Sequence, residues 1–121
     1  MNRLFLVIPC YNEEEVLGET SRQLLEKMTS LINAEKISTD SIICYVDDGS
    51  KDNTWELITK LNSENPIFRG IKLSRNRGHQ NALLAGLMTI KEECTMAISL
   101  DADLQDDINA IDEMVEEFND G

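Results

Sequence analysis

Two aspartates separated by a single residue, Asp101 and Asp103, are the clearest candidates for chemistry in the 121-residue sequence. They end an apolar run, so they leave a predicted strand where a turn can bring both carboxylates onto one cation. Mg²⁺-type ions bind nucleotides through one or two carboxylates, with phosphate oxygens completing the coordination. The alternative is that these aspartates, or Asp106 or Asp107, cap the helix that follows. The Asp-x-Asp pattern alone leaves both interpretations open.

A second acidic cluster, Asp47–Ser50, also follows an apolar run. A carboxylate there could accept a nucleobase N–H, as uracil N3–H or guanine N1–H offers, and Gly49 would let a ligand approach the backbone closely. The plainer interpretation is a turn in which Asp52 or Asn53 caps the next helix. The residues by themselves support both interpretations equally.

The one concentrated basic stretch, Arg75–Gln80, lies between a predicted strand and a predicted helix. Backbone N–H groups at a helix N-terminus favour anions. Arg75, Arg77 and His79 are therefore candidate contacts for a phosphate or a sugar. The alternative is a solvated loop that carries one exposed histidine.

Short apolar runs alternate with longer amphipathic ones, which predicts four strands and four helices in strict alternation. Because the strands are almost continuously apolar, we expect an α/β fold with a mostly parallel sheet and helices on both faces. Asn12 is a candidate cap for the first helix, and in the third helix Leu83, Leu87 and Ile90 recur at helical spacing. The predicted strands cover residues 4–9, 41–46, 68–73 and 95–100, and the predicted helices cover 13–34, 53–62, 78–91 and 108–118.

The polar clusters fall at the carboxyl ends of the predicted strands, the edge at which open α/β sheets bind ligands. Tyr11–Glu13 follows the first strand, and the three clusters described above follow the other three. Chance would scatter such groups along the chain. The sequence therefore predicts one composite site at this edge.

Composition and charge exclude several classes of protein. The net charge of −12 argues against a nucleic-acid partner and against adhesion of this segment by itself to an anionic membrane. The first apolar stretch is short and ends at Pro9, which predicts a buried strand rather than a signal peptide. The three cysteines, Cys10, Cys44 and Cys94, are predicted to be buried, reduced thiols of a cytosolic protein.

Two other α/β classes are disfavoured by where the key residues stand. A dinucleotide-binding Rossmann turn needs a Gly-x-Gly-x-x-Gly pattern after the first strand, and the turn at residues 10–14 has no glycine. A phosphoacceptor receiver needs its acidic pair after the first strand, whereas Asp47 and Asp48 follow the second.

Four segments together resemble the family 2 glycosyltransferases. The resemblance is greatest to the polyprenyl-phosphate branch, which includes dolichol-phosphate mannosyltransferases and bactoprenol glucosyltransferases. Each motif alone is weak, but the four occur in the family's order across essentially the whole chain. The segments are Val7–Glu14, Val46–Thr54, Leu73–Gln80 and Leu100–Asp106.

The resemblance implies the GT-A fold, with residues 1–121 as its nucleotide-sugar-binding half. It implies that Asp101, Asp103 and Gln105 bind Mg²⁺ or Mn²⁺. The stretch Arg75–Gln80 matches a branch motif to which we assign no role beyond the candidate contacts given above. The residues implied for nucleotide binding are Pro9, Tyr11, Glu13, Asp47, Asp48 and Asp101.

The activity implied by the resemblance is metal-dependent, inverting transfer of a sugar from a UDP- or GDP-sugar to a polyprenyl phosphate. Two alternatives remain open on the sequence. The acceptor could instead be a sugar hydroxyl in capsular or cell-wall polysaccharide synthesis, or the chain could be a non-catalytic nucleotide-binding module. The intact pair Asp101 and Asp103 argues against the second alternative.

Members of the family continue well past the position of Gly121, so we expect a truncated chain. The general base, where the family has one, the acceptor site and any membrane-anchoring helices would then lie in the missing part. The parent protein is expected in the cytoplasm, at the cytoplasmic face of the membrane. Apolar surface exposed by truncation could support a homodimer.

Overall fold

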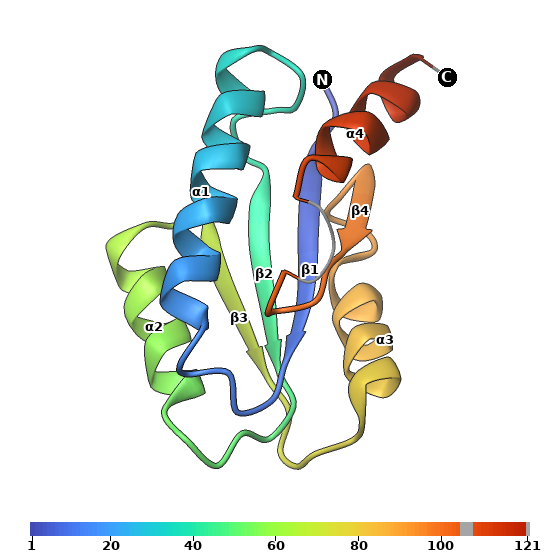
Figure 1. Cartoon of the computed structure of the whole chain (residues 1–121). Helices are drawn as coiled ribbons and strands as arrows, with labels where there is room; N and C mark the ends of the chain where they lie inside the picture. The colour runs from blue at the N-terminus through green and yellow to red at the C-terminus, as the bar shows by residue number, and fades with distance from the viewer. Residues whose placement is uncertain (105–107, 121) are drawn as a thin grey trace.

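The computed structural model describes residues 1–104 and 108–120 of the chain. Within them, strands and helices alternate strictly, as the sequence predicts, and the strands form one sheet with helices against it (Figure 1). The elements are β1 (Leu4–Cys10), α1 (Leu17–Asn33), β2 (Ile42–Asp47), α2 (Thr54–Glu64), β3 (Phe68–Lys72), α3 (His79–Ile90), β4 (Met96–Ser99) and α4 (Ala110–Asp120).

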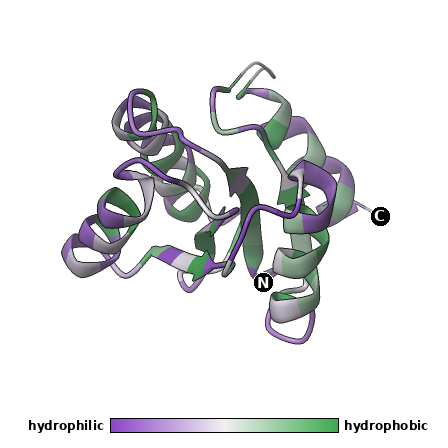
Figure 2. Ribbon diagram, turned by 90° about the horizontal axis from the view of Figure 1, so that it is seen from below, coloured by the Kyte–Doolittle hydropathy of each residue, from purple (hydrophilic) through white to green (hydrophobic). Residues whose placement is uncertain are grey.

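The sheet is parallel throughout, with the strand order β3-β2-β1-β4. β1 lies between β2 and β4, so that Val7 is in register with Cys44 on one side and with Ser99 on the other. Because all strands run in one direction, their carboxyl ends meet at one edge of the sheet. Figure 2 looks onto this edge, where the connecting loops are largely hydrophilic.

The two faces of the sheet are covered by different helices, which confirms the predicted arrangement. Leu4, Leu6 and Ile8 of β1 pack with α1, α2 and α4 on one face. Phe5 and Val7 pack with α3 on the other face. A strand buried on both faces has no polar side, which explains why β1 reads as an uninterrupted apolar run.

The side of α3 that meets the sheet is formed by two small residues and one of the three large residues noted in the sequence. Ala82, Gly86 and Ile90 are buried, whereas Leu83 and Leu87 pack only at the margin of this core. A Cβ at Gly86 would stand 2.6 Å from a methyl group of Val46. The helix therefore lies so close to β1 and β2 that large side chains are displaced to its flanks.

The start of α1 is also displaced from its predicted position. The helix begins at Leu17 rather than at residue 13, and residues 14–16 form a turn. Asn12 does not cap the helix, because its backbone has a φ of 54° and its side-chain oxygen accepts the Lys51 N–H at 2.8 Å. Asn12, which was predicted to cap the helix, instead connects the loop after β1 to the turn after β2.

The cysteines are free, and two of the three are buried as predicted. Burial raises the pKa of the Cys44 thiol to about 11, and burial likewise raises the pKa of Cys10. Cys94 differs from the prediction, since its side chain is only partly buried. In the described residues, no helix has the length and apolar character needed to cross a bilayer.

Candidate nucleotide-binding site

Three of the four predicted loops meet around one small pocket at the carboxyl edge of the sheet. The pocket has a volume of about 210 Å³. Its walls come from the segments that follow β1, β2 and β3, so residues far apart in sequence share one cavity. The lining residues are Pro9, Cys10, Tyr11, Glu13, Asp48, Asn76, Gly78 and His79.

The loop after β1 is tied to the turn after β2 by hydrogen bonds between backbone N–H groups and side-chain oxygens. Asn12 N–H donates to the Ser50 hydroxyl at 2.9 Å, and Glu13 N–H donates to the Thr54 hydroxyl at 2.9 Å. Together with the bond from Lys51 to Asn12, these contacts fix the path of the first loop past the pocket.

Asp52 supplies the hydrogen bonds that begin α2. Its carboxylate accepts the Thr54 N–H at 2.9 Å, the Thr54 hydroxyl at 2.5 Å and the Glu14 N–H at 3.3 Å. Burial acts to raise the pKa of Asp52, but the bonds from Thr54 and Glu14 outweigh it and the pKa is lowered. Of the two caps considered from sequence, Asp52 makes the contacts and Asn53 makes no side-chain cap bond.

Asp48 clamps the loop that follows β3. One carboxylate oxygen accepts the Arg77 N–H at 2.7 Å, and the other accepts the Gly78 N–H at 3.0 Å. The side chain is 3% exposed, so the clamp is shielded from water. Hydrogen bonds to a charged acceptor are stronger than neutral ones. Asp48 therefore determines where the basic segment lies.

Gly49 lets the two loops touch, which differs from the role that its sequence suggested. Its φ is 71°, and an added Cβ would stand 2.6 Å from Asn76 N and 2.7 Å from the Arg75 carbonyl carbon. The local geometry therefore explains Gly49 by its contact with protein backbone, and not by a contact with a ligand.

Asp47 is completely buried at the end of β2. One of its oxygens accepts the Ser50 N–H at 3.3 Å. Within the described part of the chain, the other oxygen is the one buried side-chain polar atom that lacks a hydrogen-bond partner. Such an oxygen has capacity to accept a donor that the chain itself does not supply.

The Asp-x-Asp segment forms a tight turn held against α1. Leu104 N–H donates to the Asp101 carbonyl at 3.0 Å, and Leu104 has a φ of 52°. The Thr20 hydroxyl donates to the carbonyl of the buried Ala102 at 2.6 Å. Because α4 begins only at Ala110, neither Asp101 nor Asp103 caps it, and the capping interpretation of this pair is wrong.

The Asp101 carboxylate lies at the border of the small pocket. Its Oδ1 is 3.6 Å from Nε2 of His79, a pocket residue, and both side chains are about half exposed. Burial raises the pKa of Glu13, and the carboxylates of Asp103, Asp52 and Asp101 raise it further. The carboxylates of the first loop and of the Asp-x-Asp turn therefore share one negative potential.

These oxygen donors suit a hard cation, but they do not enclose one. Among residues 1–104 and 108–120, no group of three or more acidic, histidine or cysteine side chains is placed to hold a metal ion. A site of two carboxylates, Asp101 and Asp103, agrees with magnesium-type sites that phosphate oxygens complete. Gln105, the third predicted ligand, lies outside the described residues.

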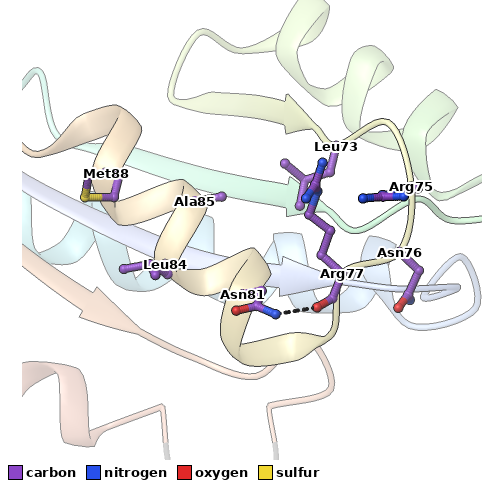
Figure 3. A pocket seen from close by; sticks show the side chains of 8 residues that line it. All are labelled: Leu73, Arg75, Asn76, Arg77, Asn81, Leu84, Ala85 and Met88. Carbon is purple, nitrogen blue, oxygen red and sulfur yellow. Dashed lines mark hydrogen bonds between the residues drawn. The ribbon is translucent and has the colours of Figure 1, made fainter.

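The predicted basic segment is divided between two cavities. His79 lines the small pocket, whereas Arg75 and Arg77 line a separate groove of about 700 Å³ with Leu84 and Met88 of α3 (Figure 3). Asn76 lines both cavities. Sequence reasoning did not single out this asparagine. Its position between two arginines, two residues before a glycine, was the available signal.

A family model for glycosyl transferase family 2 matches residues 5–121. The chain is 50% identical over 118 residues to the "Uncharacterized glycosyltransferase YkoT" of Bacillus subtilis (strain 168), covering 98% of this chain and 35% of that protein. It is 41% identical over 118 residues to the "Uncharacterized glycosyltransferase sll0501" of Synechocystis sp., covering 98% of this chain and 35% of that protein.

The structure is similar to that of S. aureus TarS 1–349 in complex with UDP-GlcNAc. The TM-score is 0.64 at 17% identity, and the match covers 98% of this chain and 31% of TarS 1–349. At this identity the likeness establishes the fold. The chain spans about a third of the length of the curated relatives that it matches. With its GT-A-like α/β fold and a family match over residues 5–121, the chain belongs to glycosyl transferase family 2.

Proposed function

We propose that the protein containing this chain transfers a sugar from a UDP- or GDP-sugar to a polyprenyl phosphate, with Mg²⁺ or Mn²⁺ and with inversion at the anomeric carbon. One observation carries the donor part of this proposal. His79 lines the small pocket and also pairs with Asp101 at 3.6 Å, so the pocket and the Asp-x-Asp turn are neighbours. A nucleoside diphosphate needs this adjacency, because its base would lie in the pocket while its diphosphate would lie at the Asp-x-Asp turn.

The base would occupy the small pocket, between the loops after β1 and β3. Pro9 and Tyr11 supply apolar surface there, and Asp48 supplies a carboxylate. The neighbouring Asp47 is not among the residues that line this pocket, but it has a buried oxygen with unused accepting capacity. Structures of TarS with UDP and with UDP-GlcNAc support a nucleotide-sugar donor for a domain of this fold.

The diphosphate would lie toward Asp101 and Asp103, whose carboxylates also act on Glu13. Gln105 follows them closely in the sequence. A divalent ion bound there would neutralise the diphosphate and stabilise it as a leaving group. The protein's own contribution is to hold these carboxylates at the pocket border. His79, which lines the pocket, would contact the phosphate or the sugar, whereas Arg75 and Arg77 would reach the donor only across the loop from their groove.

The acceptor assignment rests on the resemblance to the polyprenyl-phosphate branch. An acceptor phosphate would attack the anomeric carbon from the face opposite the diphosphate, which inverts the configuration. A phosphate is already an anion, so it needs less help from a general base than a sugar hydroxyl does. The whole protein should therefore move labelled sugar into a polyprenyl phosphate. Exclusive transfer to saccharide acceptors would contradict this assignment.

Calorimetric titration of UDP and GDP into the chain, first with Mn²⁺ and then with EDTA, tests the donor site. We expect binding of a diphosphate that EDTA abolishes. Asp101→Ala and Asp103→Ala should each lower the affinity by about 100-fold or more, since even residues behind metal ligands matter by about 10–100-fold. Asp40→Ala, at the opposite end of the sheet, is the matched control. Affinity that survives EDTA and both substitutions would reject the metal site.

A further inference from the structure

We infer that the donor carries a pyrimidine-2,4-dione base, as in UDP or dTDP, rather than guanine. The inference rests on the proposed function and narrows it. It follows from the way in which Asp48 is already engaged by the chain. Three features of the site support it: the free capacity of the carboxylate, the hydrogen-bonding groups beside it, and the rigidity of the loop that closes the pocket.

The Asp48 carboxylate is used on both oxygens. Arg77 N–H donates to Oδ1 at 2.7 Å, and Gly78 N–H donates to Oδ2 at 3.0 Å. Because Arg77 and Gly78 are successive residues, we take their N–H groups to reach the two oxygens from the same side. That side is the one at which a carboxylate accepts two parallel hydrogen bonds from one partner. Asp48 therefore retains only single lone pairs that point elsewhere.

This remaining capacity distinguishes the two bases. Guanine presents N1–H and its exocyclic amino group side by side, and a carboxylate reads them with two parallel bonds. Uracil presents a single N3–H, for which one lone pair is enough. To read guanine in the usual way, Asp48 would have to release Arg77 and Gly78, at the loss of two charge-assisted hydrogen bonds.

Asn76 is the second hydrogen-bonding group beside the pocket. Its side-chain oxygen accepts the Gly78 N–H at 3.2 Å, so its amide NH₂ is the end that can still donate to a ligand. Asn76 lines the same pocket as Asp48. An NH₂ donor suits a carbonyl, and uracil has a carbonyl on each side of N3–H. Guanine has a carbonyl on one side and an amino group on the other, which an amide donor opposes.

The loop that closes the pocket is not free to retreat for a larger base. Gly49 packs against the backbone of Arg75 and Asn76, and Asp48 holds the next two residues. The pocket volume of about 210 Å³ is below the ~300–1,000 Å³ of pockets that enclose whole drug-sized ligands. A one-ring base fits this constraint with less rearrangement than a two-ring base.

The test is a calorimetric series of diphosphates on the unmodified chain with Mn²⁺: UDP, dTDP, GDP, IDP and the diphosphate of N3-methyluridine. We expect UDP or dTDP to bind at least tenfold more tightly than GDP. The ratio of the UDP and dTDP affinities then shows whether the base is uracil or thymine. Methylation at N3 should cost at least tenfold, because one buried hydrogen bond is lost. IDP, which lacks the exocyclic amino group, should bind more tightly than GDP.

Two results would overturn the inference alone: GDP binding as tightly as UDP, or N3-methylation without effect. Failure of every diphosphate to bind in the presence of Mn²⁺ would instead overturn the proposed function, and the base assignment with it. Asp48→Asn gives a second test, with Asp40→Asn as the matched charge control. A folded Asp48→Asn chain that still separates UDP from its N3-methyl analogue would show that Asp48 does not read the base. If this variant does not fold, the ligand series on the unmodified chain decides.

Discussion

The turn after β2 and the turn after β4 both end a buried strand in aspartates, yet the chain builds them differently. After β2, Asp47 and Asp48 are buried, and the carboxylate of Asp48 holds a loop from another part of the sequence. After β4, Asp101 and Asp103 lie partly or largely in solvent. The contact between Asp101 Oδ1 and His79 Nε2, at 3.6 Å, joins two side chains that are about half exposed.

The difference shows which half of the site the chain completes by itself. The turn after β2, apart from one oxygen of Asp47, makes its hydrogen bonds within the chain and fixes the loop that lines the small pocket, and such preorganisation reduces the cost of ordering on binding. The turn after β4 instead presents its carboxylates at a partly buried and an exposed position. A site that shares its ion with a nucleotide requires this exposure, since phosphate oxygens must reach the ion.

The largest effect should come from Gly49→Ala. The new Cβ would meet backbone at 2.6 Å, and a φ of 71° is unfavourable for alanine. We expect the free energy of unfolding to fall by about 2–4 kcal/mol, measured by urea denaturation. Gly18→Ala is the control, because a Cβ there meets nothing within 4 Å in helix α1. Equal stability of the two variants would mean that the contact between the two loops is not rigid.

Asp48→Asn should have the next largest effect on stability. The amide can accept only one of the two N–H groups and turns a donor toward the other. We expect a loss of about 1–3 kcal/mol in the free energy of unfolding. Asp103→Asn, in the exposed turn, should change it by no more than about 0.5 kcal/mol. If the two substitutions cost the same, the contrast between the two turns would not hold.

Asp52→Ala should lower the free energy of unfolding by about 0.5–1 kcal/mol, as expected for a partly exposed helix cap. The pKa of Asp52 is lowered from its ordinary value of 3.8 in the folded chain, against the effect of burial, by its bonds from Thr54 and Glu14. A lowered pKa stabilises the fold above the ordinary value and ceases to do so as the pH falls through the lowered one. The difference between the two proteins should therefore be full at pH 7 and shrink below about pH 4. A difference that grows on acidification would contradict this.

The smallest effect should come from His79→Ala. An exposed pair separated by 3.6 Å contributes little, so we expect a change within about 0.5 kcal/mol in the free energy of unfolding. Thermal unfolding with and without added salt measures this contribution. A loss of 1 kcal/mol or more would mean that the turn after β4 contributes to the stability of the fold, as the turn after β2 does.

Much of the fold could be predicted because strand and helix periodicities are local properties of the chain. β1 and β2 read as apolar runs, and the buried positions Leu17, Leu24 and Met28 of α1 recur at helical spacing. The start of α1 could not be predicted, because Asn12 forms hydrogen bonds with Ser50 and Lys51 instead of capping the helix. Those partners are 38 and 39 residues distant, and a helix cap is judged from neighbours within one turn.

The sequence by itself determined the alternation of strands and helices, and it determined that the polar clusters follow the strands. Both depend on residue type and spacing along the chain. Only the tertiary structure decided that the Asp48 carboxylate accepts hydrogen bonds from Arg77 and Gly78, and that Gly49 accommodates the backbone of Asn76. It likewise decided that Arg75 and Arg77 line a different cavity from His79. The physical reason is that a parallel sheet aligns its loops at one edge, where contacts between loops distant in sequence determine which side chains remain free for a ligand.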